Sequence, residues 1–384
     1  MTSSTPTGNS SRVRVDPELT IARVETAVYR VPTDKPEADG TIAWDSTTML
    51  LVEVVAKNGA RGIGFSYASR AAAAVVQDQL ASVVVGCAIV DTGAMWDAMV
   101  RSVRNAGRPG VAATAISAVD IALWDLMGQI AQLPLFVLLG PRRCAVPVYG
   151  SGGFTTYSER ELAEQLSGWV ALGIPRVKMK VGKDSGTRPT EDVRRVQRAR
   201  SAIGSAVELF VDANGAYTVK QAINQAEAFG AADVNYFEEP VSSDQLEQLA
   251  FIRSRIDQDV AAGEYGYDPW YFRTMLRAGA VDILQADVTR CLGVTGWLEA
   301  ASIAHGFAVP FSAHTAPSIH AQIGCVAPSI AHVEYFHDHV RIEHMLFDGT
   351  PQPAGGYLAP DPSRPGLGLE LKRQDAEPFL ISRG

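Results

Sequence analysis

The sequence predicts an α/β protein whose larger part is a parallel β/α barrel. From Val146 onward, eight short apolar segments with strand character alternate with amphipathic segments of helical period. Most of the predicted strands end in a residue that can take part in chemistry, and these residues recur at about the length of one βα unit. This alternation is typical of a barrel, in which the carboxyl ends of the strands meet at one mouth.

Length and composition are those of a globular protein large enough for two domains. The chain has 384 residues, of which 47% are hydrophobic and 20% charged, with a formal net charge of −8. Because no long basic run or long apolar run occurs, we expect no nucleic-acid partner and no membrane partner. The four cysteines form no CxxC pair, so we expect neither a disulfide framework nor a zinc-thiolate site. Residues 1–20 are polar and lack the apolar core of a signal peptide, which predicts a disordered tail and a soluble cytoplasmic protein.

Residues 21–145 form the first predicted unit. Ile21–Val31 and Thr48–Val55 have the composition of strands, and a polar segment rich in Pro and Gly, Thr33–Gly40, is expected to be the loop between them. The segment Ala113–Gly128 has apolar residues at helical spacing. We therefore expect a unit that contains both strands and helices before the barrel begins.

The barrel is predicted over residues 146–347. Its candidate strands are Val146–Tyr149, Val177–Lys180, Val207–Asp212, Val234–Glu238, Val260–Glu264, Val281–Asp287, Val309–His314 and His332–Tyr335. The clearest helical patterns between them are Glu159–Ala171, Glu191–Ile203 and Val219–Phe229. After Phe347 the chain becomes rich in Pro and Gly, and we expect residues 348–384 to return to the first unit.

The strand ends carry a series of charged side chains. In chain order they are Lys178 with Lys180, Asp212, Glu238, Glu264, Asp287, His314 and Glu334, and the steps from Asp212 onward are 20 to 27 residues long. In a β/α barrel, residues at the carboxyl ends of different strands converge on one mouth, where active sites lie. The series therefore predicts one pocket built from distant parts of the chain.

The composition of this pocket indicates a metal-assisted reaction. Lys178 and Lys180 are two residues apart in a strand, so both point to the same face, here the mouth. Asp212, Glu238 and Glu264 would form a hard oxygen site suited to Mg²⁺. A cation there would bind a substrate carboxylate and stabilise the enediolate formed by removal of the α-proton.

The other residues of the series supply candidate acids and bases. Lys180 is the expected base, because Lys178 and the metal beside it would lower its pKa. Asp287 and His314 are expected to form an orienting dyad, with His314 as acid or base on the other face of the substrate. Glu334 would hydrogen-bond the substrate carboxylate if it were protonated.

Each of these residues also has a structural interpretation. A strand-end Asp or Glu often caps the next helix or pairs with a surface lysine, and a strand with two lysines can be an edge strand. For Glu239, beside Glu238, we expect the structural role. His337 and His339 suggest a transition-metal site, although HxH without further spacing favours a loop that lines the pocket or a subunit contact. No segment matches a dinucleotide fingerprint or a P-loop, and the ordered series as a whole favours an active site.

The motifs together resemble the enolase superfamily, in particular its mandelate racemase subgroup. The resemblance extends over nearly the whole chain after the first twenty residues. The motifs that carry it are VKMKVG, VDANGAY, FEEP, AGE, QADVTRCLGVTGW, SAH and HVEYF, together with the helix AISAVDIALWDLMG before the barrel. One departure is the segment Arg290–Leu292, where relatives often carry a glycine pair; it concerns the shape of the sixth-strand loop and not the dyad.

The resemblance implies a (β/α)₇β modified TIM barrel with an α+β capping domain made from residues 21–145 and 348–384. It implies Mg²⁺ on the three carboxylates and acid/base groups on opposite faces of the substrate. Asn214 and Glu334 match positions that assist metal or substrate oxygens. Lys178 matches a position beside the substrate carboxylate.

Proteins with this residue set mostly dehydrate sugar acids, and fewer racemise or epimerise them. The resemblance therefore implies dehydration of an aldonic or aldaric acid to a 2-keto-3-deoxy acid. A racemase or epimerase with the same two bases is the alternative, and a sugar-acid-binding protein without turnover is a third. We expect the segments Thr33–Ser46, Gly64–Arg70 and Thr315–His320 to select the substrate, and we expect a homo-oligomer.

Overall fold

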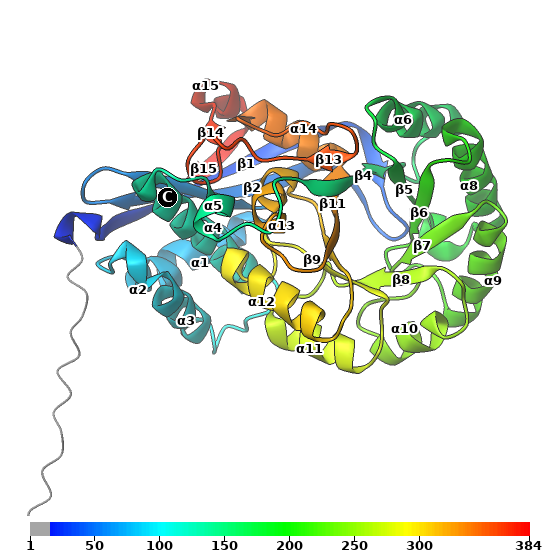
Figure 1. Cartoon of the computed structure of the whole chain (residues 1–384), viewed down its shortest axis with the longest axis horizontal. Coiled ribbons are helices and arrows are strands. Elements are labelled where there is room, and N and C mark those ends of the chain that lie inside the picture. Colours follow the sequence, from blue (N-terminus) through cyan, green and yellow to red (C-terminus); the bar gives the residue numbers. More distant parts are fainter. Residues whose placement is uncertain (1–15) are drawn as a thin grey trace, which may run out of the picture.

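An antiparallel sheet with the strand order β15-β1-β2-β3 organises the first domain (Figure 1). The computed structural model describes residues 16–384, so residues 1–15 of the predicted tail lie outside the described part; the short 3₁₀ helix η1 (Pro17–Leu19) precedes the sheet. The sheet strands are β1 (Ile21–Ala38), β2 (Ala43–Ala56), β3 (Arg61–Ser66) and β15 (Leu380–Arg383). The helices of this domain are α1 (Arg70–Val75), α2 (Ala81–Val84), α3 (Thr92–Ser102), α4 (Val111–Ala131) and α5 (Leu135–Leu138), with single turns at Val76–Leu80 and Ile89–Asp91.

The predicted loop Thr33–Gly40 is largely strand, which corrects the sequence prediction. β1 continues to Ala38, and its pairing with β2 resumes at Glu37 opposite Trp44 after an irregularity that begins at Pro32. A proline cannot donate a ladder hydrogen bond, and here Pro36 lies within the irregular stretch, where no pairing is required. The two strands therefore form a long ribbon that reaches toward the barrel.

Helix α4 joins the two domains. Two glycines of β3 let the helix approach closely, because a Cβ on Gly64 would lie 2.2 Å from the carbonyl oxygen of Ala118 and one on Gly62 would lie 2.3 Å from that of Ala122. On the barrel side, Asp120 accepts hydrogen bonds from the backbone and hydroxyl of Thr295, at 2.9 and 2.8 Å. α4 is long and apolar enough to cross a membrane, but 83% of its apolar window is buried inside the protein, as in a core helix.

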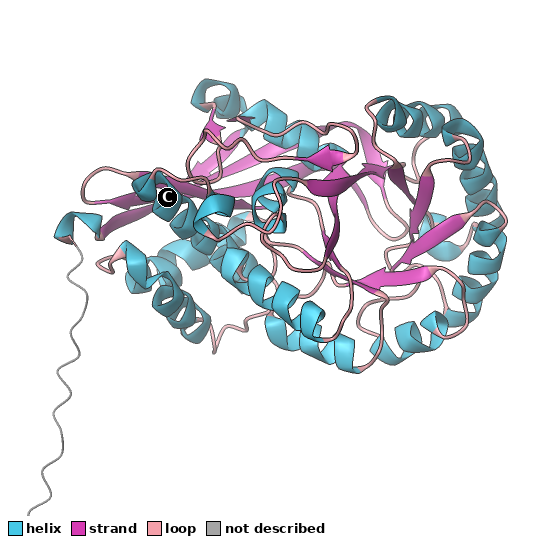
Figure 2. Ribbon diagram, in the orientation of Figure 1, coloured by secondary structure: helices cyan, strands magenta, loops and turns pink. Residues whose placement is uncertain are grey.

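The second domain is a closed barrel of eight parallel strands, β4 to β11, in which β11 pairs with β4. The strands are β4 (Val146–Gly152), β5 (Arg176–Lys180), β6 (Glu208–Asp212), β7 (Val234–Glu238), β8 (Asp259–Ala262), β9 (Ile283–Ala286), β10 (Phe311–Ala313) and β11 (Ile330–Phe336). The helices are α6 (Glu159–Ala171), α7 (Lys183–Gly186), α8 (Pro189–Ile203), α9 (Val219–Gly230), α10 (Leu246–Arg253), α11 (Pro269–Arg277), α12 (Gly293–Gly306), α13 (Pro317–Gly324) and α14 (His337–Leu346). Helices surround the ring of strands (Figure 2), and the predicted (β/α)₇β barrel with a capping domain is confirmed.

The interior of the barrel is filled below the mouth by aromatic rings. Tyr149, Phe210 and Tyr236 are buried there, and the rings of Phe210 and Tyr236 stack with centroids 4.4 Å apart. His332 packs edge-on against Tyr149 with centroids 4.8 Å apart. This packed layer fills the barrel below its mouth, where active sites of such barrels lie.

The C-terminal segment contacts both domains. It contains β12 (Phe347–Asp348), β13 (Tyr357–Leu358), β14 (Glu370–Leu371), α15 (Arg373–Ala376) and a 3₁₀ turn at Glu377–Phe379 before β15. β13 pairs with β4 of the barrel, whereas β15 pairs with β1 of the capping sheet. The segment therefore fastens the cap to the barrel.

Leu292 marks the departure from the glycine pair in the sixth-strand loop. Its φ of 72° is in the left-handed region that glycine favours, and its side chain is fully buried in the core of the capping domain. Its carbonyl accepts a hydrogen bond of 2.9 Å from the indole of Trp96. The loop therefore keeps a backbone suited to glycine while using the leucine side chain as an inter-domain contact.

Candidate active site

Strand register brings the three predicted metal ligands together. Lys180 pairs with Asp212 across β5 and β6, Asp212 pairs with Glu238 across β6 and β7, and Glu264 follows β8. Asp212, Glu238 and Glu264 each offer one oxygen, and these atoms all lie within 4.8 Å of one another. All three residues are buried.

The cluster fits a divalent cation. Glu238 Oε1 and the side-chain oxygen of Asn214 are buried and accept no hydrogen bond from the described residues. Burial and then repulsion by Asp212 raise the pKa of Glu238 to about 8. Unsatisfied oxygens and mutually repelling carboxylates are what a hard cation such as Mg²⁺ would neutralise.

Lys178 is buried among carboxylates. Its Nζ is 2.7 Å from Glu238 Oε2, 2.8 Å from Glu334 Oε1 and 3.4 Å from Asp212 Oδ2. Burial lowers the pKa of Lys178, but Glu238 and Glu334 outweigh burial and hold this pKa well above its usual value. Lys178 is therefore a fixed positive charge in the floor of the mouth.

Lys180 reaches the cavity, and the carboxylates around it act against the lower pKa expected from Lys178 and the metal. Burial and Lys178 lower the pKa of Lys180, but the carboxylate of Asp212 lies 2.5 Å from its Nζ. Asp212, Glu264 and Glu238 together outweigh burial and Lys178, so these carboxylates raise the pKa of Lys180. The sequence could place the two lysines on one face but could not show that each would face a carboxylate at contact distance.

The predicted His314–Asp287 dyad is present. His314 Nδ1 lies 2.8 Å from Asp287 Oδ2, and the other oxygen of Asp287 accepts hydrogen bonds of 2.7 Å from both the backbone and the hydroxyl of Thr289. Because the carboxylate can only accept, Nδ1 carries the proton and Nε2 faces the cavity, 3.1 Å from Glu264 Oε2. Burial lowers the pKa of His314, but Glu264 and Glu334 outweigh it and raise this pKa to about 10.

The surroundings of Glu334 favour its ionised form, so the condition under which it would donate a hydrogen bond to the substrate carboxylate is not met. Its oxygens accept hydrogen bonds from Ser151 Oγ at 2.6 Å and from the backbone of Thr315 at 3.0 Å. Burial raises the pKa of Glu334, but Lys178 and His314 outweigh burial and lower this pKa to about 2. Glu334 therefore orders Lys178 and the loop after β10, and does not donate a proton.

Arg290 is a site residue that sequence reasoning missed. Its guanidinium lies 3.3 Å from Glu264 Oε1 and 3.4 Å from Asp287 Oδ2, and it covers the ring of Tyr265 at 5.2 Å. It thus bridges a candidate metal ligand and the dyad. Its position three residues after Asp287 was the available signal, since the loops after barrel strands face the mouth.

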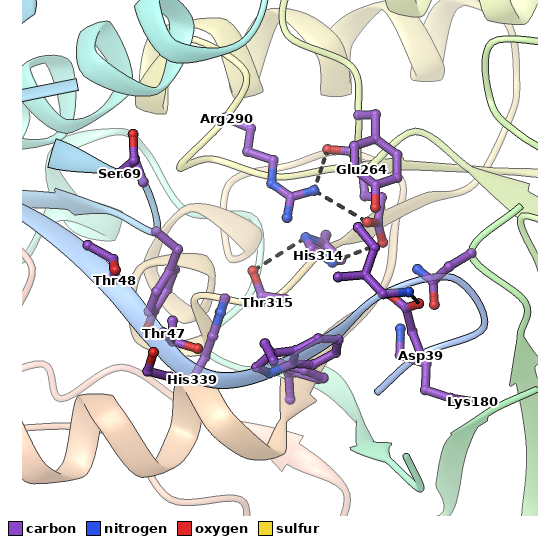
Figure 3. A pocket seen from close by; sticks show the side chains of 18 residues that line it. Asp39, Thr47, Thr48, Ser69, Lys180, Glu264, Arg290, His314, Thr315 and His339 are labelled. Atoms are coloured by element: carbon purple, nitrogen blue, oxygen red, sulfur yellow. Dashed lines mark hydrogen bonds and ion pairs between the residues drawn. The ribbon is translucent and has the colours of Figure 1, made fainter. Parts of the chain in front are cut away.

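A cavity of about 440 Å³ opens above these groups (Figure 3). Lys180, Asn214, Glu264, Arg290 and His314 line its barrel side. The cap contributes mainly hydroxyl and aromatic groups; its lining residues are Asp39, Ile42, Trp44, Ser46, Thr47, Thr48, Tyr67, Ala68 and Ser69. In Figure 3, Thr47, Thr48 and Ser69 lie on the opposite side of the cavity from Lys180. All three segments that we expected to select the substrate contribute to the lining.

The two histidines of the HxH pair have separate surroundings. His339 lines the cavity and stacks on Tyr67 with ring centroids 3.4 Å apart. His337 instead lies 3.1 Å from Asp34 of β1. They do not form a metal site with each other.

Comparison with known proteins agrees with this architecture. Residues 23–140 match the family described as mandelate racemase / muconate lactonizing enzyme, N-terminal domain, and residues 161–376 match the enolase C-terminal domain-like family. The chain belongs to the mandelate racemase / muconate lactonizing enzyme family of the enolase superfamily. The predicted family is therefore confirmed.

The relatives with named activities are enzymes of sugar-acid metabolism. A 3,6-anhydro-alpha-L-galactonate cycloisomerase of Streptomyces coelicolor is 32% identical over 91% of this chain and 97% of its own length. An arabinonate dehydratase of Saccharolobus solfataricus is 31% identical over 72% of this chain and 75% of its own length. One of these relatives is a cycloisomerase and the other is a dehydratase, which is a lyase. The prediction that the protein is an enzyme is confirmed.

Solved structures of the family have the same fold. A mandelate racemase/muconate lactonizing enzyme-like protein from Rubrobacter xylanophilus is 52% identical, with a TM-score of 0.91 over 94% of this chain and all of its own. A racemase from Streptomyces coelicolor with bound magnesium is 30% identical, with a TM-score of 0.88 over 94% of this chain and all of its own. Magnesium, the predicted cofactor, is thus present in a related structure.

Proposed function

We propose that this protein is a Mg²⁺-dependent sugar-acid dehydratase that converts an aldonic or aldaric acid to a 2-keto-3-deoxy acid. Asp212, Glu238 and Glu264 would hold the cation, with the free oxygen of Asn214 nearby. When bound, Mg²⁺ supplies positive charge that acidifies the proton next to the substrate carboxylate. The dehydratase names of several relatives support this proposal.

In this proposal, different residues of the chain bind the substrate, remove the α-proton and donate a proton to the leaving hydroxyl. The fixed ammonium of Lys178 attracts the substrate carboxylate to the floor of the mouth. With Asp212 committed to the cation, its ion pair with Lys180 would weaken and the pKa of Lys180 would fall. Lys180, then a neutral amine, takes the α-proton on its Nζ while the C–H bond breaks. His314 donates a proton from Nε2 to the hydroxyl on the next carbon, so the C–O bond breaks and water leaves. The enol that remains takes up a proton to become the 2-keto acid.

The observation that carries the proposal is the shared access of Lys180 and His314 to one cavity. Both line it, and they come from strands on different sides of the mouth, β5 and the end of β10. The hydroxyl groups of Thr47, Thr48 and Ser69 line the side of the cavity away from Lys180, where the hydroxyls of a sugar chain would lie.

The same two groups also serve a racemase or epimerase, in which one base removes the α-proton and the other returns a proton on the opposite face. That reaction would exchange the α-proton without loss of the β-hydroxyl. A binding protein without turnover has less support, because Lys180 and His314, which could move protons, both line the cavity.

A substrate screen tests the proposal. The purified protein with Mg²⁺ is incubated with a library of aldonic and aldaric acids, aldonolactones and 3,6-anhydro-galactonate, and 2-keto acids are measured with semicarbazide. We expect one or a few acids to give 2-keto-3-deoxy products, and the Lys180→Ala variant to give none. Exchange of the α-proton in D₂O without keto acid would replace the dehydratase by an epimerase. Ring opening without loss of water would replace it by a cycloisomerase.

A further inference from the structure

A second group of potential metal ligands lies outside the candidate active site. Asp34 and Glu37 belong to the distal part of β1, and His337 is the first residue of α14. His337 Nε2 lies 3.2 and 3.1 Å from the two oxygens of Asp34, and one ligand atom from each of the three residues lies within 4.8 Å of the others. We refer to Asp34, Glu37 and His337 as the strap cluster, because it joins the cap ribbon to a barrel helix.

Glu37 is the buried member of the strap cluster. Its side chain is fully buried, and Oε1 has no hydrogen-bond partner within residues 16–384. The other oxygen, Oε2, accepts a hydrogen bond of 2.8 Å from the indole of Trp44. Burial, followed by repulsion from Asp338, raises the pKa of Glu37 to about 8. A buried carboxyl with a free oxygen, beside an aspartate and an imidazole, is unsatisfied by the protein alone.

The neighbouring basic side chains do not pair with Glu37. Lys35 turns away and its ammonium donates a hydrogen bond of 2.9 Å to Glu161. Arg341 donates to Asp338 at 2.7 Å and to the carbonyl of Pro32. Neither of them makes a hydrogen bond or an ion pair with Glu37, so the cluster retains unneutralised acidic groups.

We propose that the strap cluster binds a divalent transition-metal ion of the Zn²⁺ type through one imidazole nitrogen and two carboxylate oxygens. One nitrogen with two carboxylates is a donor set that Zn²⁺ accepts, whereas Mg²⁺ favours oxygen donors alone. The charges also balance, because two ionised carboxylates and a neutral imidazole match a dication. His337 and Asp34 remain partly exposed, with 25% and 42% of their side-chain surface accessible, so the ion has an entry path and a water can complete its coordination.

The ion would fasten the wall of the substrate cavity. Beyond Glu37, the same ribbon docks on the barrel, where Thr155 donates hydrogen bonds to the carbonyls of Ala38 at 2.8 Å and Asp39 at 2.7 Å. Trp44, which lines the cavity, is bonded to Glu37. A metal shared by β1 and α14 would therefore hold the ribbon against the barrel and fix the position of Trp44.

Metal stoichiometry tests this inference without an activity assay. The protein is dialysed to equilibrium against micromolar Zn²⁺ with excess Mg²⁺, which occupies sites made of oxygen alone, and bound zinc is measured by mass spectrometry. We expect His337→Ala and Asp34→Asn to bind one equivalent of zinc less than the unmodified protein. His305→Ala and Asp45→Asn change an exposed histidine and an exposed aspartate elsewhere, and should bind as much zinc as the unmodified protein.

Thermal unfolding provides a second reading on the same variants. Zn²⁺ should raise the melting temperature of the unmodified protein, and this rise should be absent in Asp34→Asn. Because Asp34 is exposed, the substitution should leave the fold intact, so loss of the rise would report loss of the ion. Equal zinc content in the unmodified protein, His337→Ala and Asp34→Asn would overturn the proposal. So would failure of the unmodified protein to bind zinc under these conditions. Because the measurement needs no substrate, its result is independent of the proposed dehydration.

Discussion

Replacing Asp287 by Asn should remove one of the two acid/base groups without removing the imidazole. Thr289 donates two hydrogen bonds to Asp287 Oδ1, from its backbone and its hydroxyl, both 2.7 Å long. In Asp287→Asn the amide oxygen must stay on this side, because an amide nitrogen cannot accept. The NH₂ group then faces His314 Nδ1, where Asp287 Oδ2 now lies at 2.8 Å.

The consequence is a change of tautomer. A donor opposite Nδ1 requires Nδ1 to be unprotonated, so in the neutral ring the proton moves to Nε2, the nitrogen that faces the cavity. His314 then cannot accept a proton there, and the imidazolium form loses its stabilising carboxylate. The tautomer defect in a Ser-His-Asp triad lowers the rate by about 10⁴, and loss of general acid–base catalysis by about 10² to 10⁴. We therefore expect a loss of about 10³ for proton exchange on the face served by His314.

Deuterium incorporation at C2, followed by NMR with both C2 epimers of an active sugar acid, separates the two faces. Asp287→Asn should lose exchange with the epimer whose proton faces His314, as His314→Asn does, and keep exchange with the other epimer. Lys180→Ala should show the opposite preference. If Asp287→Asn kept its His314-face exchange within about tenfold of the unmodified protein while His314→Asn lost it, the tautomer argument would be refuted.

Two further predictions concern the metal and the domain contact. Glu238→Gln should abolish Mg²⁺ binding in calorimetry while the fold survives, since it removes one of three mutually repelling carboxylates; Glu343→Gln, a buried glutamate that accepts from Ser318, is the control and should bind Mg²⁺ normally. Leu292→Ala should lower the free energy of unfolding by about 2–5 kcal/mol by leaving a cavity. Leu292→Gly should be no less stable than Leu292→Ala in denaturant unfolding, because relief of about 1–2 kcal/mol at φ 72° offsets the usual glycine penalty of about 0.5–1 kcal/mol; a clearly less stable glycine variant would contradict the strain argument.

The barrel and its charged mouth could be predicted because their signals are local and repeated. Each strand is a short apolar run, and the side chain at its end needs only the βα period to be assigned to the mouth. Asp212, Glu238 and Glu264 converge because adjacent parallel strands are in register, as Lys180 with Asp212 and Asp212 with Glu238 demonstrate.

The charge state of the site could not be predicted, because it depends on distances of a few ångströms between strands. Lys178 and the metal were expected to lower the pKa of Lys180, but the carboxylates around Lys180, with Asp212 at 2.5 Å, act in the opposite direction. Glu334 was considered as a proton donor, yet Lys178 at 2.8 Å keeps it ionised. In both cases residue order gives the strand and the face, but not which neighbour each charged group contacts.

The contribution of the β1–β2 ribbon to the cavity could not be predicted for a different reason. Pro36 and the polar residues around it indicated a loop, but pairing with β2 resumes at Glu37 and the irregular stretch accommodates the proline. This irregular ribbon turns Asp34 toward His337 and Glu37 toward Trp44, so one segment contributes both to the cavity wall and to the strap cluster. The barrel mouth supplies the reacting groups, whereas the ribbon supplies the surface that meets the rest of the substrate. Variation in this ribbon can therefore change which sugar acid fits while Lys180 and the dyad stay in place, which is how one fold serves many substrates.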